Sequence, residues 1–279
     1  MTKAIQSIRE IAHQFDAIVL DQWGVLHDGS APYETAPACL SDLHSAGTRL
    51  SVLSNSGKRA APNASRIASM GFAEEIFETV MTSGEALFLD FQISPKCPRK
   101  ILPIERSEGD ALEWAQGLDI MLSRDIEDAD AILLMGLPDG MGTEPFDNVL
   151  QTALSRKLPL YCSNPDLTSP RAGGALVVSS GVLAKIYEDA GGTVHLYGKP
   201  HLPIFHALEA MLNCVPNRIL MVGDSLHHDI HGGANAGWKT LLIEGGIHKA
   251  DLDGTGQRAQ RLADVEGIPR ADFTMTRLR

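Results

Sequence analysis

Several apolar runs of the chain end on a polar residue that could take part in chemistry. These residues are Asp21, Ser54, Asn55, Lys199 and Asp224. Ligands of open parallel sheets bind at the carboxyl ends of the strands, where such residues would lie. If the runs are neighbouring strands, one edge of a sheet therefore holds two carboxylates, a hydroxyl, a backbone amide and an ammonium.

This combination of groups suits phosphoryl transfer. Asp21 and Asp224 offer the hard oxygen ligands that Mg²⁺ prefers, and Mg²⁺ also binds a substrate phosphate. A carboxylate oxygen of Asp21 could attack phosphorus and form an aspartyl-phosphate that water later hydrolyses. Ser54, the backbone amide of Asn55 and Lys199 could hold the transferring oxygens. A single Asp at a strand end is more often a cap or turn residue, so the prediction depends on the whole set.

The elements that must position these residues are those of an α/β fold. Four apolar runs have the length and the end residues of buried parallel strands, at 17–20, 49–54, 218–223 and 239–244. Segments 32–47 and 203–215 carry apolar residues three and four positions apart, as crossover helices do. We predict a doubly wound, Rossmann-like parallel sheet.

The middle of the chain has strand-like runs of its own, at 100–104, 119–123, 130–136 and 158–163. Runs of the first kind flank this region on both sides, so it indicates a smaller α/β domain inserted into the first. We predict core residues 1–81 and 196–279 and an inserted domain at 82–195. A chain of 279 residues is suited to two domains.

The composition limits the partners that the protein could have. There are 35 acidic and 24 basic residues, a net charge of −11, which repels nucleic acids and anionic lipid surfaces. We therefore expect no nucleic-acid or membrane partner. A small anionic substrate fits only where a metal ion or basic groups reverse the local field.

The cysteines and the N-terminal segment indicate the cytoplasm. The four cysteines are far apart, without a CxxC pair, so we expect reduced thiols. Apolar residues from Ile5 to Phe15 have helical spacing, and polar residues interrupt them too often for a signal sequence. No run approaches the length of a membrane span.

Four segments resemble the motifs of the haloacid dehalogenase (HAD) superfamily. They are LDQWGVLHDG at 20–29, VLSNSGKRA at 52–60, YGKP at 197–200 and VGDSLHHDIHGGANAG at 222–237. The insertion between the second and third motifs is similar to that of the large-cap, class IIA subfamily. That subfamily includes nucleotide, sugar-phosphate, pyridoxal-phosphate and phosphoglycolate phosphatases. The segment CSNPDLTSPRAGG at 162–174 resembles its cap signature.

The resemblance implies a role for each matching residue. Asp21 would be the nucleophile, Ser54 the phosphate-binding hydroxyl, Lys199 the charge-neutralising lysine and Asp224 a metal ligand. Asp229 would support the metal shell, as carboxylates beside a metal commonly do. The resemblance further implies Mg²⁺ as cofactor, a small phosphorylated metabolite as substrate, and a possible homodimer through the cap.

Position 23 departs from the family pattern. The family's phosphatases carry a second Asp two residues after the nucleophile as general acid and base, and this chain has Trp23. Indole cannot shuttle that proton, although the family binds Mg²⁺ through the backbone carbonyl here. Loss of a general acid/base lowers the rate by ~10²–10⁴-fold. Either the substrate carries a good leaving group, or His27 or Asp28 supplies the proton; alternatively, both residues only form a turn.

Other residues leave alternatives open. Asn164, Asp166 and Arg171 in the cap signature are candidates for substrate contact or for turn formation. His227, His228 and His231 could bind a transition metal, or they could be exposed residues at a helix start.

Two other functions also stay open. Without the acid/base, the chain could be a phosphate-ligand-binding or regulatory protein that keeps the fold. Dehalogenases of the superfamily carry an aromatic residue at the place of Trp23, but the large insertion and the complete GDSLHHD segment count against that function.

Overall fold

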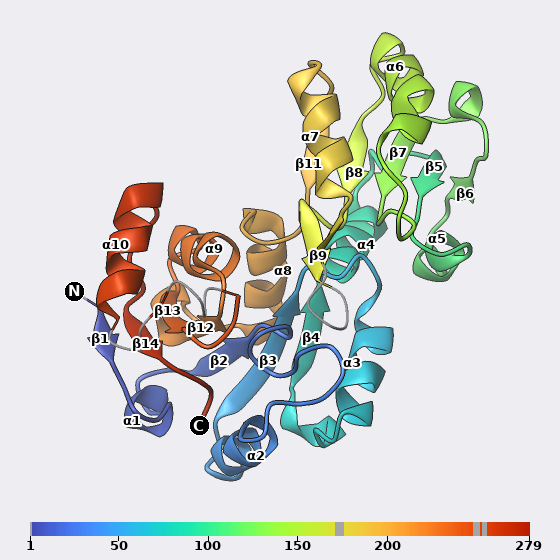
Figure 1. Cartoon of the computed structure of the whole chain (residues 1–279). Coiled ribbons are helices and arrows are strands. Elements are labelled where there is room, and N and C mark those ends of the chain that lie inside the picture. The colour runs from blue at the N-terminus through green and yellow to red at the C-terminus, as the bar shows by residue number, and fades with distance from the viewer. Residues whose placement is uncertain (1, 171–175, 248–251, 253–255) are drawn as a thin grey trace. The chain divides into compact units, whose positions relative to one another are not determined.

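The computed structural model describes residues 2–170, 176–247, 252 and 256–279. The chain forms two compact units (Figure 1). The core unit comprises Met1–Ser54, Ala61–Met81 and Lys199–Arg279, and the cap unit comprises Asn55–Ala60 and Thr82–Gly198. The cap unit begins its longer segment at residue 82, as the predicted insertion at 82–195 does, and ends it three residues later. It also includes a short segment from the first part of the chain.

Hydrogen bonds explain why this short segment belongs to the cap unit. The Gly84 N–H donates to Ser56 O at 3.0 Å, and Thr82 Oγ1 donates to Lys58 O at 2.6 Å. The segment therefore lies against the start of the first cap helix. The chain passes from one unit to the other between Ser54 and Asn55.

The core unit is built on a seven-stranded sheet in the order β1-β14-β13-β12-β2-β3-β4. The strands are β1 Lys3–Ala4, β2 Ala17–Leu20, β3 Arg49–Ser54, β4 Thr79–Thr82, β12 Ile219–Gly223, β13 Lys239–Ile243 and β14 Phe273–Met275. The strands pair in parallel at β1–β14, β14–β13, β13–β12, β12–β2 and β2–β3. Residues of β2 and β12 are buried throughout, because both faces of the sheet are covered.

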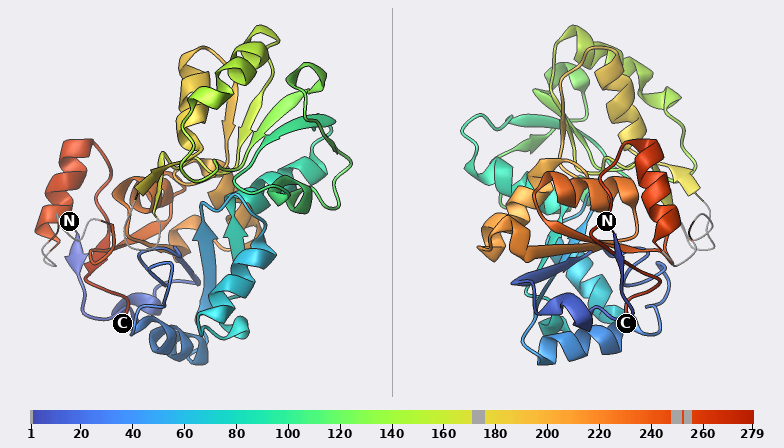
Figure 2. Two further views of the ribbon diagram at one scale, coloured as in Figure 1. Left: turned by 45° about the vertical axis from the view of Figure 1, so that its right-hand side comes forward. Right: turned by 90° about the vertical axis from the view of Figure 1, so that its left-hand side faces the viewer.

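Helices cover the core sheet on both faces (Figure 2). α1 (Arg9–Ala12), α2 (Ala36–Ser45) and α3 (Ala60–Ser69) pack on one face, in one apolar cluster with alternate residues of β2 and β3. α8 (Leu202–Leu212) and α9 (Gly232–Asn235) lie on the other face, where Gly233 approaches the side chains of Met221 and Thr240. A further helix, α10, spans Gln257–Glu266.

The cap unit has its own parallel sheet of five strands, in the order β11-β8-β7-β5-β6. The strands are β5 Lys100–Ile104, β6 Met121–Leu122, β7 Ala131–Leu134, β8 Leu160–Cys162 and β11 Val194–Leu196. α6 (Asp147–Ser155) and α7 (Gly181–Asp189) share an apolar cluster with β7 and β8. α4 (Ser83–Ile93) and α5 (Asp110–Trp114) carry aromatic residues. Phe91 of α4 meets Tyr161 of β8 edge to face, with ring centroids 4.9 Å apart.

Short elements complete the structure. β9 (Thr168–Pro170) and β10 (Leu176–Val178) form a two-stranded antiparallel sheet. Single 3₁₀ turns lie at Glu74–Ile76, Ile126–Asp128, Glu144–Phe146 and Pro216–Arg218, and a π-helix spans Leu226–His231. None of the helices in the described part of the chain has the length and apolar character that a bilayer crossing requires.

The predicted α/β class with parallel sheets is confirmed, and two local predictions are wrong. The run 194–198 before Lys199 was expected beside the core strands, but β11 pairs with β8 in the cap sheet. The N-terminal segment is helical only over Arg9–Ala12, and Lys3–Ala4 before it pairs with β14 as an edge strand. In both cases the pairing partner is distant in sequence, so local spacing could not identify it.

Candidate active site

Three strand ends of the core sheet bring predicted site residues to one edge. Asp21 directly follows β2, and its N–H donates to Val222 O of β12 at 2.9 Å. β2 lies between β12 and β3. Ser54, the last residue of β3, and Asp224, which follows β12, therefore leave the sheet at the same edge as Asp21.

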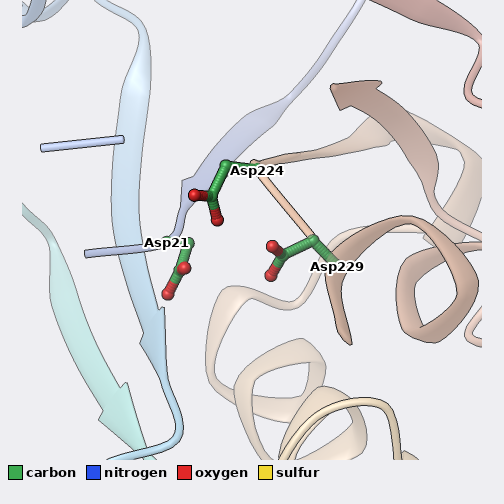
Figure 3. Close-up of side chains that lie close together, drawn as sticks. All are labelled: Asp21, Asp224 and Asp229. Atoms are coloured by element: carbon green, nitrogen blue, oxygen red, sulfur yellow. The ribbon is translucent and has the colours of Figure 1, made fainter. Parts of the chain in front are cut away.

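Three carboxylates converge at this edge. One carboxylate oxygen from each of Asp21, Asp224 and Asp229 lies within 4.8 Å of the others, and Figure 3 shows the side chains turned toward a common space. Asp229 comes from the π-helix that follows β12 and is fully buried. Among the described residues, this is the one group of three or more His, Cys, Asp and Glu side chains whose ligand atoms converge.

Lys199 places an ammonium between two of these carboxylates. Its Nζ lies 2.7 Å from Asp21 Oδ1 and 2.7 Å from Asp229 Oδ1, and its side chain is buried. The chain enters the core unit at Lys199 as it leaves the cap unit. Lys199 thus reaches Asp21 from a connection between units, and no strand of the core sheet carries it.

Burial and mutual repulsion shift the pKa values of these groups. Burial raises the pKa of Asp21 to about 6, where Lys199 lowers it and Asp229 raises it further. Burial also raises the pKa of Asp224 well above its ordinary value, and Asp21 adds to the shift. Burial alone would lower the pKa of Lys199, but contact with Asp21 and Asp229 raises it, so the ammonium stays charged.

Backbone groups hold two of the carboxylates in place. The Ile247 N–H donates to Asp224 Oδ2 at 2.7 Å, and the Ser225 N–H donates to Asp229 Oδ2 at 3.0 Å. A Cβ at Gly24, where φ is +78°, would lie 1.7 Å from Asp224 Oδ2, and one at Gly246 would lie 2.1 Å from it. The close approach of the Asp224 carboxylate therefore requires glycine at both positions, which the sequence reasoning missed.

The carboxylate group fits Mg²⁺. Asp21, Asp224 and Asp229 offer hard oxygen ligands, which suit Mg²⁺ better than a softer transition metal. Burial and the neighbouring carboxylates raise the pKa values of Asp21 and Asp224, and a divalent cation bound among these groups would favour their charged forms. The three histidines at 227, 228 and 231 are not part of this group.

Trp23 lies in the loop that follows Asp21. Its ring meets the His27 ring edge to face, with centroids 5.7 Å apart. A Cβ at Gly29 would lie 2.0 Å from Trp23 Cη2, so the missing side chain leaves room for the indole. The loop therefore packs the indole against two of its own residues, His27 and Gly29.

His27 and Asp28 are both engaged in this loop. The fully buried His27 accepts a hydrogen bond from the Gly29 N–H through Nδ1 at 3.1 Å. Burial and the nearby Arg66 lower the pKa of His27 to about 4, so its imidazole is neutral. The exposed Asp28 accepts hydrogen bonds from the N–H groups of Ser30 and Ala31 at 2.8 and 2.9 Å. Both residues thus take part in forming a turn.

The remaining predicted site residues lie in the cap unit. Asn55 Nδ2 donates to Asp166 Oδ1 at 2.7 Å, and Asn164 Oδ1 accepts from the Asp166 N–H at 3.1 Å. Both side chains in the cap signature are therefore hydrogen-bonded to protein groups. Arg171, the third candidate of that signature, lies outside the described residues.

Comparison with known proteins agrees with this geometry. A family model described as haloacid dehalogenase-like hydrolase matches residues 18–104, and one described as HAD-hydrolase-like matches residues 196–265. The chain is similar to chronophin of Rattus norvegicus, with 27% identity over 86% of this chain and 80% of that protein.

Solved structures give the same result. A haloacid dehalogenase-like hydrolase from Brucella suis superposes with a TM-score of 0.81 at 28% identity, covering 99% of this chain and 100% of that one. A glycerol phosphate phosphatase from Mycobacterium tuberculosis in complex with magnesium superposes with a TM-score of 0.67 at 26% identity, covering 87% and 71%. The sequence resemblance is thereby confirmed, and this chain belongs to the haloacid dehalogenase superfamily of hydrolases.

Proposed function

We propose that this chain is a Mg²⁺-dependent phosphatase that hydrolyses a small phosphorylated metabolite through an aspartyl-phosphate on Asp21. The position of Asp21 carries the proposal. Its carboxylate contacts the Lys199 ammonium at 2.7 Å and shares a space with two further carboxylates. A carboxylate nucleophile beside an ammonium and a cation site has the groups that covalent phosphoryl transfer needs.

Each residue has a defined part in the proposed reaction. An Asp21 oxygen attacks phosphorus as the leaving oxygen departs, and water then cleaves the aspartyl-phosphate and restores the carboxylate. Lys199 neutralises charge on the transferring group. Ser54 Oγ and the Asn55 N–H donate to phosphoryl oxygens, where preorganised donors lower the barrier most.

The metal site in this proposal comprises Asp21, Asp224 and the backbone carbonyl of Trp23, with Asp229 in support. Bound Mg²⁺ supplies positive charge that attracts the substrate phosphate and stabilises charge in the transition state. Asp229 bonds Lys199 and the Ser225 amide, so it also orients the ammonium.

The loop after Asp21 favours substrates with good leaving groups. His27 and Asp28 are its two titratable residues, and both are engaged in the turn. Trp23 has no titratable group near neutral pH. No residue of this loop would then protonate the leaving oxygen. Acyl and aryl phosphates tolerate the lack of a proton donor better than alkyl phosphates do.

The substrate class is supported by the relatives. The mycobacterial relative is named for glycerol phosphate, a small phosphorylated metabolite. The net charge of −11 also favours a small ligand that binds at a cation site over a large polyanion. The phosphatase name of this relative counts against carbon–halogen hydrolysis as the function of the present chain.

Phosphate release from a panel of aryl, acyl, sugar and nucleotide phosphates, with Mg²⁺ and with EDTA, tests the proposal. We expect Mg²⁺-dependent release that is abolished by EDTA. Asp21→Asn keeps the shape of the side chain and should lower kcat by roughly 10³-fold or more, since the nucleophile is lost. Mass spectrometry after acid quench should find the phosphoryl group on the peptide that contains Asp21.

Two results would contradict the proposal. Wild-type turnover in Asp21→Asn would exclude the covalent route. Silence across the panel, combined with saturable binding of a phosphorylated metabolite, would instead identify a phosphate-ligand-binding or regulatory protein. We also propose the homodimer implied by the resemblance, which analytical ultracentrifugation checks.

A further inference from the structure

A side-chain hydrogen bond joins two loops of the cap unit. Asn55 Nδ2 donates to Asp166 Oδ1 at 2.7 Å. Asn55 is 9% exposed, and Asp166 is partly buried. Hydrogen bonds to an ionised carboxylate are shorter and about twice as strong as neutral ones. The Asp166 carboxylate is therefore a strong fixed acceptor for the Asn55 side chain.

The backbone around Asp166 is itself rigidly held. The Asp166 N–H donates to Asn164 Oδ1 at 3.1 Å, and Asp166 O accepts from the Gly181 N–H at 3.0 Å. Ser180 Oγ donates to Asn164 O at 2.8 Å. A Cβ at Gly181 would lie 2.1 Å from Pro165 O, so the loop packs directly on the start of α7. Asp166 thus has little freedom to turn toward a ligand.

The loop that carries Asn55 is held just as closely. Ser56 O accepts from the Gly84 N–H at 3.0 Å. A Cβ at Gly57 would lie 2.6 Å from Met135 O, and one at Gly84 would lie 2.1 Å from Gly57 O. Backbone packing therefore fixes residues 56 and 57, and the side chain of Asn55 is fixed by its bond to Asp166.

We propose that Asp166 is a positioning residue for the phosphate-binding amide of Asn55. This inference rests on the proposed function, in which the Asn55 N–H donates to a phosphoryl oxygen. By holding the Asn55 side chain, Asp166 limits rotation of the peptide that joins Ser54 and Asn55, and so keeps that N–H directed at the substrate. Asp166 acts without touching the substrate, unlike the contact residue expected from the sequence.

Substitutions at Asp166 separate positioning from substrate contact. Asp166→Leu removes the acceptor at similar volume and should lower kcat by about 10–100-fold, the range seen when supporting partners of a site are lost. KM should change by less than about threefold, since ground-state contacts are untouched. Asp166→Asn keeps an acceptor without the charge, so it should lose less than Asp166→Leu.

A reversed pair provides the rescue test. Asn55→Asp alone places two carboxylates together and should be the least active variant. In the double variant Asn55→Asp with Asp166→Asn, the amide and the carboxylate exchange places at unchanged net charge. We expect the activity of the double variant to be at least tenfold higher than that of Asn55→Asp alone. Failure to recover any activity would overturn the positioning role.

Binding of orthovanadate, measured by calorimetry in Mg²⁺ buffer, tests the same role without turnover. Asp166→Leu should weaken orthovanadate binding about tenfold or more, whereas Asp119→Asn should not. Asp119 is a matched control because it lies in the same unit, its side chain is 96% exposed, and it pairs with Arg99 at the surface. Melting curves of all variants check that the fold is intact.

The outcomes distinguish the two proposals. If Asp166→Leu has wild-type kcat and wild-type orthovanadate affinity, or if only KM rises, the positioning role is wrong and the phosphatase assignment stands. If wild-type protein binds orthovanadate in a manner that depends on Asp166 but releases no phosphate, the phosphatase assignment is wrong and positioning stands. Wild-type protein that shows neither activity nor binding would overturn both.

Discussion

The residue at position 23 bears on which classes of phosphate the proposed site could hydrolyse. The indole of Trp23 lies against the His27 ring and Gly29, so it is part of the packing of the loop that follows Asp21. The family pattern predicted that an acid/base is missing here. It could not predict that His27 is buried and neutral, because burial depends on how the loop folds back on itself.

Trp23→Asp should widen the substrate range. The new carboxyl would lie two residues after Asp21 and next to Gly24, whose Cβ position meets the Asp224 carboxylate. Neighbouring carboxylates raise the pKa of such a group and favour a protonated form that can donate to the leaving oxygen. We expect kcat for alkyl phosphates to rise about tenfold or more, and kcat for aryl phosphates to change little. Steady-state phosphate release with both substrate classes measures the effect.

Trp23→Phe is the control for this substitution. It keeps an aromatic ring against Gly29 and adds no titratable group, so neither substrate class should gain. If Trp23→Asp loses activity on both classes while its melting temperature is preserved, the indole shapes or dries the substrate pocket, and the leaving-group argument is wrong.

Strand ends are the elements that assemble the site. Asp21, Ser54 and Asp224 could be predicted because each follows or ends a mainly apolar run, and such runs form buried parallel strands. The run before Lys199 has a similar pattern, yet β11 pairs with β8 in the other sheet. Local sequence identifies a strand but does not identify its partner. Lys199 lies beside Asp21, but not because its strand belongs to the core sheet.

The turn after β2 leaves space for the Asp224 carboxylate through Gly24. Gly24→Ala would bring a methyl group into the Asp224 carboxylate, because the Cβ position lies 1.7 Å from Oδ2. We expect Mg²⁺ affinity, measured by calorimetry, to fall about tenfold or more, since the carboxylate must shift away from its place. Activity at low Mg²⁺ should fall in parallel.

Gly47→Ala separates collision from backbone strain. Gly47 also has positive φ, at +85°, but a Cβ there meets nothing within 4 Å. Its substitution should lower stability by roughly 1 kcal/mol through strain alone and leave Mg²⁺ affinity unchanged. Equal Mg²⁺ affinity in the two alanine variants would show that Asp224 does not depend on Gly24.

For the whole molecule, the two-unit organisation was predictable from the alternation of strand-like and helical segments, but the assignment of residues 55–60 was not. That segment is short and polar, and the groups that hold it come from later in the chain, such as Gly84 and Asp166. The candidate phosphate-binding residues Ser54 and Asn55 consequently fall in different units. A sequence pattern gives their adjacency but not this division.

The buried carboxylates Asp21 and Asp224 should make the free energy of unfolding of the protein depend on pH and on bound metal. Without metal, the folded-state pKa of Asp21 is raised to about 6 from an ordinary 3.8. Between these values the folded state binds more protons than the unfolded state, so stability falls as pH rises. The stabilising effect is fully present below about pH 3.8 and is lost above about pH 6. Asp224 has the same sign of shift.

Mg²⁺ should therefore stabilise the protein more at pH 7.5 than at pH 5, because protons compete with the metal for the same carboxylates. At a hundredfold excess over Kd, binding contributes about 2.7 kcal/mol, which is roughly 5–10 °C in melting temperature for a domain of this size. At pH 5 the same Mg²⁺ concentration should give less than about half of that shift, since part of the binding energy goes to displacing protons. Differential scanning calorimetry at both pH values, with Mg²⁺ and with EDTA, measures the difference. Asp224→Asn removes a ligand and should abolish the shift at both pH values; an equal shift at pH 5 and pH 7.5 in the wild type would mean that Mg²⁺ binds elsewhere.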